Sequence, residues 1–246
     1  MIIIGDIGNT VTKICFVNSK FKIIKRYNFD TKHINNSLLK KLIKTKFSKS
    51  VNKAIFCSVV PKSFKLVRKF LIRFLKIKVY ELKDLKLNSL LKIKVNKTQI
   101  GSDRISNALS VVNNKDNFII LDFGTATTFD VLIKNVYYGG VIAPGVQLSL
   151  NTLIKNATLI PNLNLKKVSK VVGSNTISAV QSGFFWGYNG LIMNIINLIK
   201  KETGKTYKII TTGGFSHLFK NSIDKKIIID KDITIKGLIK ACNLIN

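Results

Sequence analysis

The feature that most constrains this chain is a short motif that occurs twice. Residues 1–17 read MIIIGDIGNTVTKICFV, and residues 118–133 read FIILDFGTATTFDVLI. Each segment has the pattern of an apolar strand, a tight turn with one carboxylate and small hydroxyl residues, and a second strand. The repeat predicts a duplicated domain that carries one such loop in each copy. A shift of 116 positions places Asp6 on Asp122, Gly8 on Gly124 and Thr12 on Thr128.

The rest of the chain alternates between expected strands and expected helices, which is the pattern of an α/β protein. Residues 52–61 form an apolar run that ends at a proline, and residues 37–47 and 64–75 carry apolar side chains at helical spacing. A chain of 246 residues is long enough for two domains of about 120 residues each. No linker separates the halves, so the repeat alone sets the boundary. We expect α/β domains at residues 1–115 and 116–246.

The net charge of +29 raises the question of nucleic-acid binding. Only four of the 41 basic residues are arginine, and the chain is also rich in isoleucine and asparagine, as expected after drift toward AT-rich codons. Most lysines lie between apolar residues at helical spacing, which places them on solvated helix faces. Nucleic-acid-binding surfaces usually add arginines and exposed aromatic residues. We therefore expect no nucleic-acid partner.

The cellular setting follows from a few further features. Cys15, Cys57 and Cys242 are far apart, so neither a disulfide framework nor a zinc cluster is indicated. The opening MIII has no basic leader, so we expect no signal peptide. Residues 171–199 contain no charged residue, but asparagines and glycines interrupt them where a bilayer span would be evenly apolar. We expect a cytoplasmic protein with no membrane partner, in which this segment forms buried core or a subunit interface.

Carboxylates are scarce in this lysine-rich chain, and several lie in the repeated loops. Of 12 acidic residues, Asp6, Asp103, Asp122 and Asp130 lie in or beside the motif loops. Mg²⁺ that is bound to a nucleotide needs only one or two protein carboxylates. Backbone amides and hydroxyls of turns such as DIGNT and DFGTATT can also bind phosphates. A single loop of this composition is most simply a good turn, but the pair favours phosphate binding.

The segment GSDR at residues 101–104 is a second candidate site. Asp103 and Arg104 are adjacent at the start of an expected helix, whose N-terminus favours anions. Arg104 has the planar fork that clamps a substrate carboxylate, and Asp103 can accept a proton from a hydroxyl nucleophile. An exposed ion pair that caps a helix would look the same in the sequence. From these four residues alone, both interpretations stay open.

Taken together, the motifs of this chain are similar to those of the type III pantothenate kinases. Each motif is short, but their order and spacing over nearly all 246 residues are specific. The resemblance implies the fold of the actin, sugar kinase and chaperone ATPase superfamily, in which duplicated ribonuclease-H-like domains bind ATP in a central cleft. It also implies transfer of the γ-phosphate of ATP to the primary hydroxyl of pantothenate, the first step of coenzyme A synthesis. The matching motifs are DIGNT, SVVP, GSDRISNA, DFGTATTFD, GGVIAPG, NTISAVQSG, TTGG and DITIKGL.

The resemblance also implies roles for residues, cofactors and partners. Asp103 would be the catalytic base, Asp122 would ligate a monovalent cation (K⁺ or NH₄⁺), and Asp6 would lie near the Mg²⁺ of ATP. Gly213 and Gly214 would lie near the adenosine. Members of the family are homodimers with the substrate pocket near the subunit interface, which would suit the uncharged segment. The expected ATP-binding residues are Asp6, Ile7, Gly8, Asn9, Thr10, Val11, Thr12, Lys13 and Thr125. The expected pantothenate-binding residues are Gly101, Ser102, Asp103, Arg104 and Thr176.

One departure and two rival interpretations accompany the resemblance. Ahead of GSDR the family often shows a tyrosine and then Asn-Pro, where this chain has Lys94 and Lys97. This departure concerns one aromatic wall of the substrate pocket, not the phosphate machinery. Another small-molecule kinase or ATPase on the same fold would carry the same loops, although sugar kinases are much longer. The alternative from a different class is a regulatory paralogue that binds nucleotide or DNA without catalysis, and the retained Asp6, Asp103 and Asp122 weigh against it.

Overall fold

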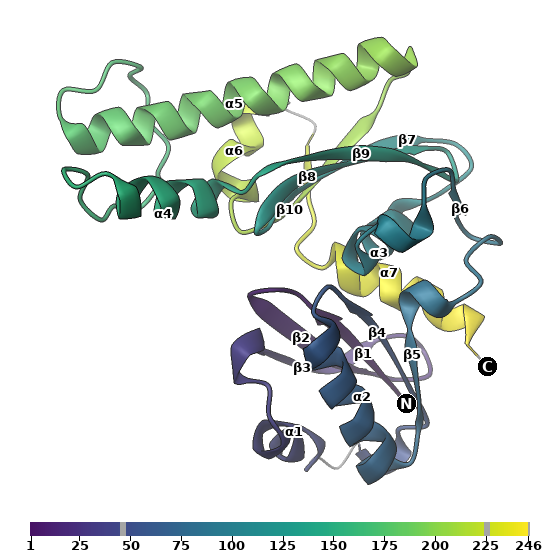
Figure 1. Cartoon of the computed structure of the whole chain (residues 1–246). Coiled ribbons are helices and arrows are strands. Elements are labelled where there is room, and N and C mark those ends of the chain that lie inside the picture. Colours follow the sequence, from purple (N-terminus) through teal and green to yellow (C-terminus); the bar gives the residue numbers. More distant parts are fainter. Residues whose placement is uncertain (45–47, 224–226, 246) are drawn as a thin grey trace. The chain divides into compact units, whose positions relative to one another are not determined.

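The computed structural model describes residues 1–44, 48–223 and 227–245 (Figure 1). The chain divides into two compact units. The first unit comprises residues 1–112, 135–137 and the C-terminal residues from 232 onward, and the second comprises residues 113–134 and 138–231. The division expected from the sequence repeat, into domains at residues 1–115 and 116–246, stays a prediction.

The first unit is built on a five-stranded sheet. Its strands are β1 (Ile2–Ile7), β2 (Val11–Val17), β3 (Ile23–Asp30), β4 (Lys53–Ser58) and β5 (Lys78–Glu81). The strand order is β3-β2-β1-β4-β5, in which the first three strands form an antiparallel meander. β4 runs parallel to β1, and β5 runs parallel to β4. β1 and β4 are nearly continuous apolar runs, as is typical of strands buried on both faces.

Helices cover this sheet. The α-helices described in the first unit are α1 (Asn36–Ile43), α2 (Pro61–Leu75), α3 (Ser102–Val111) and α7 (Ile233–Ala241). Leu39 of α1 and Phe70 of α2 pack with Ile3 of β1 in one apolar core, whereas α3 and α7 pack against each other and contact β4. The expected helix at 37–47 ends at Ile43, and residues 45–47 lie outside the described residues. Short 3₁₀ turns span Thr31–His33, Ser48–Ser50, Leu82–Asp84 (η3), Lys97–Gln99 (η4) and Cys242–Leu244.

The second sheet contains β6 (Lys92–Ile93), β7 (Asn117–Phe123), β8 (Ala126–Ile133), β9 (Val136–Pro144), β10 (Lys208–Gly213) and β11 (Ile228–Ile229). Its strand order is β11-β10-β7-β8-β9-β6. The helices described in the second unit are α4 (Val146–Asn156), α5 (Thr176–Thr203) and α6 (Ser216–Ile223). Leu121 of β7, Phe185 of α5 and Phe219 of α6 belong to the buried core of this unit.

The two sheets repeat one topology. In each, two consecutive strands form an antiparallel hairpin, and a later strand lies parallel to the first strand of that hairpin: β4 beside β1, and β10 beside β7. The motif that recurs in the sequence forms the first hairpin of each sheet. The predicted α/β class and the duplication are therefore confirmed.

The duplication is not a uniform shift, because the second turn is one residue shorter than the first. Ile7 pairs with Thr12, whereas Phe123 pairs with Thr127. Thr127, rather than Thr128, therefore occupies the place of Thr12. The side chains of Thr12 and Thr127 are both fully buried, so the two residues share the same environment as well as the same place in the hairpin.

The uncharged segment 171–199 consists mainly of α5. This helix begins at Thr176 after a capping box and ends at Gly204, which adopts a left-handed conformation. One face of the helix, with Phe185, is buried in the core, which agrees with the expectation of buried core for this segment. The opposite face is exposed and includes Trp186. Among the residues that the structure describes, no helix is both long and apolar enough to cross a membrane.

Candidate functional site

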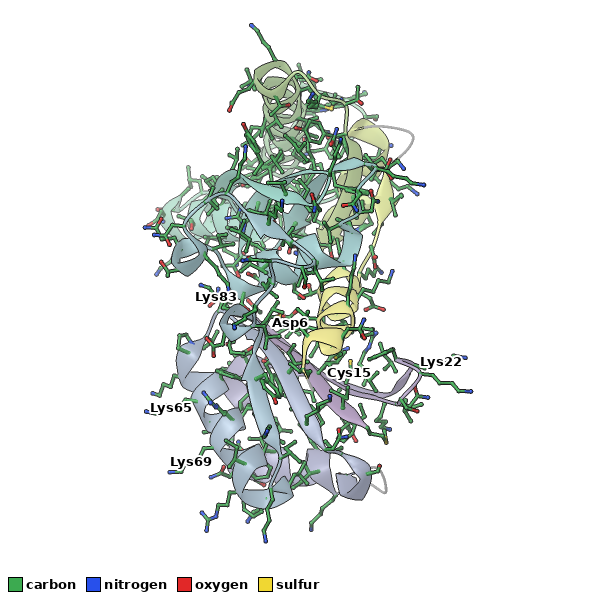
Figure 2. All side chains as sticks on the ribbon, turned by 90° about the vertical axis from the view of Figure 1, so that its right-hand side faces the viewer. Asp6, Cys15, Lys22, Lys65, Lys69 and Lys83 are labelled. Carbon is green, nitrogen blue, oxygen red and sulfur yellow. The ribbon has the colours of Figure 1, made fainter. Side chains whose placement is uncertain are left out.

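The carboxyl ends of the parallel strands in the first unit form one polar edge. In register, Asp6 of β1 lies beside Cys57 of β4, whose buried thiol donates a hydrogen bond to Asp6 Oδ1 over 3.5 Å. Glu81 ends β5 at the same edge. Figure 2 shows Asp6 at this end of the strands, whereas Lys65 and Lys69 point outward from α2. In open α/β sheets, ligands bind outside this edge.

Asp6 lies in surroundings that disfavour its charge. Burial raises the pKa of Asp6 from its ordinary value of 3.8 to about 6. The ammonium of Lys13 opposes this rise, and the charge of Asp103 adds to it. Lys13 is the residue directly opposite Asp6 in the β1–β2 hairpin, so both side chains lie on one face of the sheet. The site therefore combines a carboxylate of raised pKa with an adjacent cation.

The turn that follows Asp6 is exposed at its tip. The Gly8 N–H donates to the Val11 carbonyl over 3.1 Å and closes the turn. Asn9, Thr10 and Val11 are exposed, although the carbonyls of Thr10 and Val11 already accept hydrogen bonds within the first unit. The side chains of Ile7 and Thr12 are fully buried, so these two members of the expected ATP-binding set face the protein interior.

Thr31, which the sequence did not single out, supports this turn from below. Its hydroxyl donates to the Gly8 carbonyl over 2.7 Å and lies 2.9 Å from the hydroxyl of Thr12. Its N–H donates to the Thr10 carbonyl over 2.8 Å. A single buried threonine thus fixes both ends of the turn. No local signal marks Thr31, because its partners lie about twenty residues away in the chain.

The GSDR segment forms the start of α3. Gly101 is the N-cap residue, and a Cβ at this position would collide with the Asp103 carboxylate. Asp103 Oδ1 accepts a hydrogen bond from the Arg104 N–H over 2.8 Å. Burial raises the pKa of Asp103, whereas the N–H and guanidinium of Arg104 and the ammonium of Lys83 lower it. Asp103 is therefore a partly buried carboxylate whose proton affinity is higher than usual.

Two carboxylates meet at this edge, and their chemistry suits a divalent cation. The charge of Asp103 contributes to the raised pKa of Asp6, so the two groups repel each other when both are ionised. A cation with oxygen ligands would relieve this repulsion, and Mg²⁺ carried by a nucleotide needs only one or two protein carboxylates. Within the described residues, no group of three or more His, Cys, Asp and Glu side chains is arranged to hold a metal ion. Two carboxylates would suit an Mg²⁺ whose other ligands are phosphate oxygens.

The second unit carries its own loop at the equivalent strand end. Asp122 of β7 is partly buried and lies beside Thr212 of β10. The Gly124 N–H donates to the Ala126 carbonyl over 3.1 Å and closes the turn, which leaves Thr125 exposed. The DFGT turn thus offers a carboxylate, a hydroxyl and backbone oxygens, which are the ligands that hard cations prefer.

Two glycines allow neighbouring loops to approach the DFGT turn. A Cβ at Gly145, the N-cap residue of α4, would collide with the Thr125 carbonyl. Gly213 has a φ of 86°, and a Cβ there would collide with the backbone of Phe123. The next residue, Gly214, donates its N–H to the Phe123 carbonyl over 3.1 Å. Only glycine fits at positions 145 and 213 without such a collision.

The remaining expected substrate residue, Thr176, is the first residue of α5 and is exposed. The side chain of Asn175 accepts from the Ser178 N–H over 2.9 Å and fixes the helix start. The structure thus brings Gly101 to Arg104 together with Asp6 in the first unit, and Thr176 belongs to the second.

The family model of the type III pantothenate kinases matches residues 2–198. The chain belongs to this family. It is 66% identical over 247 residues to a type III pantothenate kinase from Pelagibacter ubique (strain HTCC1062), and the match covers 100% of both chains. The family predicted from the motifs is therefore confirmed, and with it the assignment of an enzyme rather than a silent regulatory paralogue.

Solved structures support the fold of this kinase family member. A conserved protein from Campylobacter jejuni, described as a candidate Baf family transcriptional activator, superposes with a TM-score of 0.65 at 18% identity and covers 98% of this chain and 97% of its own. A candidate 2-dehydro-3-deoxygalactonokinase from Sinorhizobium meliloti also gives a TM-score of 0.65, at 9% identity, with coverage of 100% and 99%. At these identities the likeness concerns the fold alone, and it confirms the predicted duplicated ribonuclease-H-like class.

Proposed function

We propose that this chain phosphorylates pantothenate with ATP to give 4'-phosphopantothenate, the first step of coenzyme A synthesis. The observation that carries the proposal is the full-length match to a type III pantothenate kinase. The meeting of Asp6 and Asp103 at one strand edge supports it, because phosphoryl transfer needs charge neutralisation and a group that orients the attacking hydroxyl.

ATP is assigned to the turn after β1. The exposed tip of this turn, residues 9–11, would bind phosphate oxygens, and the Lys13 ammonium would offset their charge. Asp6 would hold the Mg²⁺ that neutralises the phosphates. Thr12 would act from behind the turn, since its hydroxyl lies against Thr31. On this assignment, the turn is a rigid cradle rather than a flexible loop.

Pantothenate is assigned to the start of α3. Asp103 would orient the primary hydroxyl of pantothenate and accept its proton while the hydroxyl oxygen attacks the γ-phosphorus. The bond from the γ-phosphorus to the β,γ-bridging oxygen then breaks, and ADP leaves. The raised pKa of Asp103 supports this role, because a more basic carboxylate is a better proton acceptor. Arg104 would hold the pantothenate carboxylate through its planar fork.

The loops of the second unit are assigned to the cation and the nucleoside. Asp122 would ligate K⁺ or NH₄⁺, Thr125 would contact ATP, and Gly213 and Gly214 would lie near the adenosine. The oxygen-rich DFGT turn supports the cation assignment. Thr176, at the exposed start of α5, would contact pantothenate.

The assembly and location are proposed as a cytoplasmic homodimer. Ile177, Trp186 and Leu198 of α5 are large apolar side chains that are 44%, 39% and 53% exposed, but they lie at separate points around and along the helix. The dimer proposal therefore rests on the resemblance to the type III pantothenate kinases. Light scattering at micromolar concentration checks the dimer, and a monomeric mass would contradict it.

The function is tested by mixing the purified chain with ATP, Mg²⁺, K⁺ and pantothenate and measuring phosphopantothenate by mass spectrometry. Asp103→Asn keeps the size of the side chain but cannot readily accept a proton, so turnover should fall by about a hundredfold or more. ATP affinity should change little, because the residues assigned to ATP are not altered. Near wild-type turnover of Asp103→Asn would show that Asp103 is not the base.

A further inference from the structure

The start of α3 is held by a short segment that no motif includes. Residues 81–85, which end β5 and form η3, make three side-chain hydrogen bonds to residues 97–102, which lead into α3. We call residues 81–85 the clamp. Leu82 and Leu85 are buried and anchor it in the first unit. The clamp therefore joins the rigid sheet to the segment that carries Asp103.

The central contact of the clamp is between Glu81 and Ser102. Ser102 is only 1% exposed, and its hydroxyl donates to Glu81 Oε1 over 2.5 Å. The second carboxylate oxygen, Oε2, accepts from the Lys83 N–H over 2.5 Å. Ser102 belongs to the residues expected to bind pantothenate, but its hydroxyl faces Glu81 in this structure. The side chain of Ser102 is thus placed for support rather than for substrate contact.

Two lysines extend the clamp on the other side of Gly101. Lys83 Nζ donates to the Thr98 carbonyl over 2.9 Å, and Lys97 Nζ donates to the Leu85 carbonyl over 3.0 Å. The segment before α3 is therefore fixed at Thr98 and again at Ser102. Lys97 stands where the family often has proline, and its hydrogen bond supplies rigidity at that position.

The N-cap residue of α3, Gly101, has no side chain that could cap the helix. The first turn is held by the Asp103 carboxylate, which accepts from the Arg104 N–H, and from outside the helix by the clamp. Burial raises the pKa of Glu81, whereas the hydrogen bonds from Ser102 and Lys83 lower it and favour the ionised acceptor. Hydrogen bonds to a charged acceptor are among the stronger ones in proteins, so the contact between the partly buried Glu81 and the buried Ser102 is a firm anchor.

We propose that Glu81 is a positioning residue for the kinase reaction. Through Ser102 it fixes the first turn of α3, and thereby the place of the Asp103 carboxylate at the polar edge. The inference rests on the proposed role of Asp103. A displacement of about 1 Å in a reacting group can cost about a hundredfold in rate, so loosening this anchor should lower kcat while ATP binding is retained.

The test is a double-mutant cycle with Glu81→Ala and Ser102→Ala. If Ser102 acts through Glu81, each single variant lowers kcat by about 10- to 100-fold. The kcat of the double variant should then be no lower than that of the less active single variant. The KM for ATP should stay within about threefold of the wild-type value, since the ATP-binding turn is not altered. Matched controls are Glu202→Ala, the other glutamate of the chain, which is exposed, and Ser110→Ala, on the same helix.

Glu81→Gln serves as the conservative rescue. Its amide oxygen can accept from the Lys83 N–H, and its NH₂ group can donate to the Ser102 hydroxyl, so kcat should stay within about threefold of wild type. If Glu81 and Ser102 only stabilised the fold, Glu81→Ala and Ser102→Ala would lower the melting temperature, but the non-additive fall in kcat and its rescue by Glu81→Gln would not be seen. If Glu81→Ala does not fold, the comparison of Ser102→Ala with Glu81→Gln decides the question.

Three results overturn the proposal: additive losses in the cycle, wild-type kcat in Ser102→Ala, or a loss in Glu81→Gln as large as in Ser102→Ala. Additive losses would mean that Ser102 contacts substrate directly. A wild-type protein that forms no phosphopantothenate would instead refute the proposed function. The two failures are therefore distinguishable in one set of assays.

Discussion

Replacing Gly237 in α7 with alanine should weaken the first unit. Gly237 is buried, and a Cβ there would collide with the backbone carbonyl of Ser106 in α3 and lie 2.7 Å from its hydroxyl. The carbonyl belongs to a helix and cannot rotate away, so α3 and α7 have to separate. That movement would stretch two buried hydrogen bonds, from Ser106 Oγ to the Thr234 carbonyl (2.7 Å) and from Thr234 Oγ1 to Asn107 Oδ1 (2.8 Å).

The expected magnitude is the balance of three contributions. Overpacking costs about 1–3 kcal/mol, and a weakened buried hydrogen bond costs about 1 kcal/mol more. Alanine in a helix is favoured over glycine by up to about 1 kcal/mol, which offsets part of the loss. The net destabilisation is about 2 kcal/mol. For a chain of this size, that lowers Tm by about 4–8 °C if unfolding is two-state.

Thermal unfolding followed by circular dichroism measures this change. Lys236→Ala is the matched control, because Lys236 is exposed and precedes Gly237 in the same helix. We also expect kcat to fall in Gly237→Ala, because α3 carries Asp103. A Tm of Gly237→Ala equal to or above that of Lys236→Ala would refute the close packing on which the argument depends.

Two further predictions concern the carboxylates of the repeated loops. Asp6→Asn should stabilise the ligand-free protein at pH 7.5 while abolishing kinase activity. Because the folded pKa of Asp6 is about 6 and its ordinary value is 3.8, the folded chain holds more protons between these values, and stability falls as pH rises through them. The stabilisation should therefore vanish below about pH 4, and a Tm difference that does not depend on pH would contradict the assignment. Asp122→Asn should remove most of the activation by K⁺, and wild-type activity should be low in a buffer that contains only Na⁺; a wild type that is indifferent to K⁺ would rule out the cation site.

The sequence by itself determined the features that short local patterns encode. The apolar runs and the Asp-Gly-Thr turns at residues 6–12 and 122–128 specify a hairpin, because strand period and turn chemistry are local properties. Two copies of that hairpin specified the duplication, and the order of the motifs specified the family. The GSDR segment was also placed correctly at a helix start, because helix starts carry local signals.

Tertiary structure alone decided which distant residues support these loops. Thr31 lies beneath the first turn, Glu81 holds Ser102, and Cys57 contacts Asp6 because parallel strands bring their carboxyl ends to one edge. Strand register cannot be read from either strand alone. For the same reason, the uniform shift of 116 positions aligned Thr12 with Thr128, although the second turn is one residue shorter and Thr127 takes that place.

The C-terminal helix is the clearest case. The guanidinium of Arg26 in β3 binds both carboxylate oxygens of Asp232, 206 residues later, at 2.8 and 2.9 Å. α7 follows Asp232 and packs in the first unit against α3, although the sequence repeat groups it with the second half of the chain. No local pattern encodes that return, because it depends on packing between surfaces that exist only after both helices and the sheet have formed.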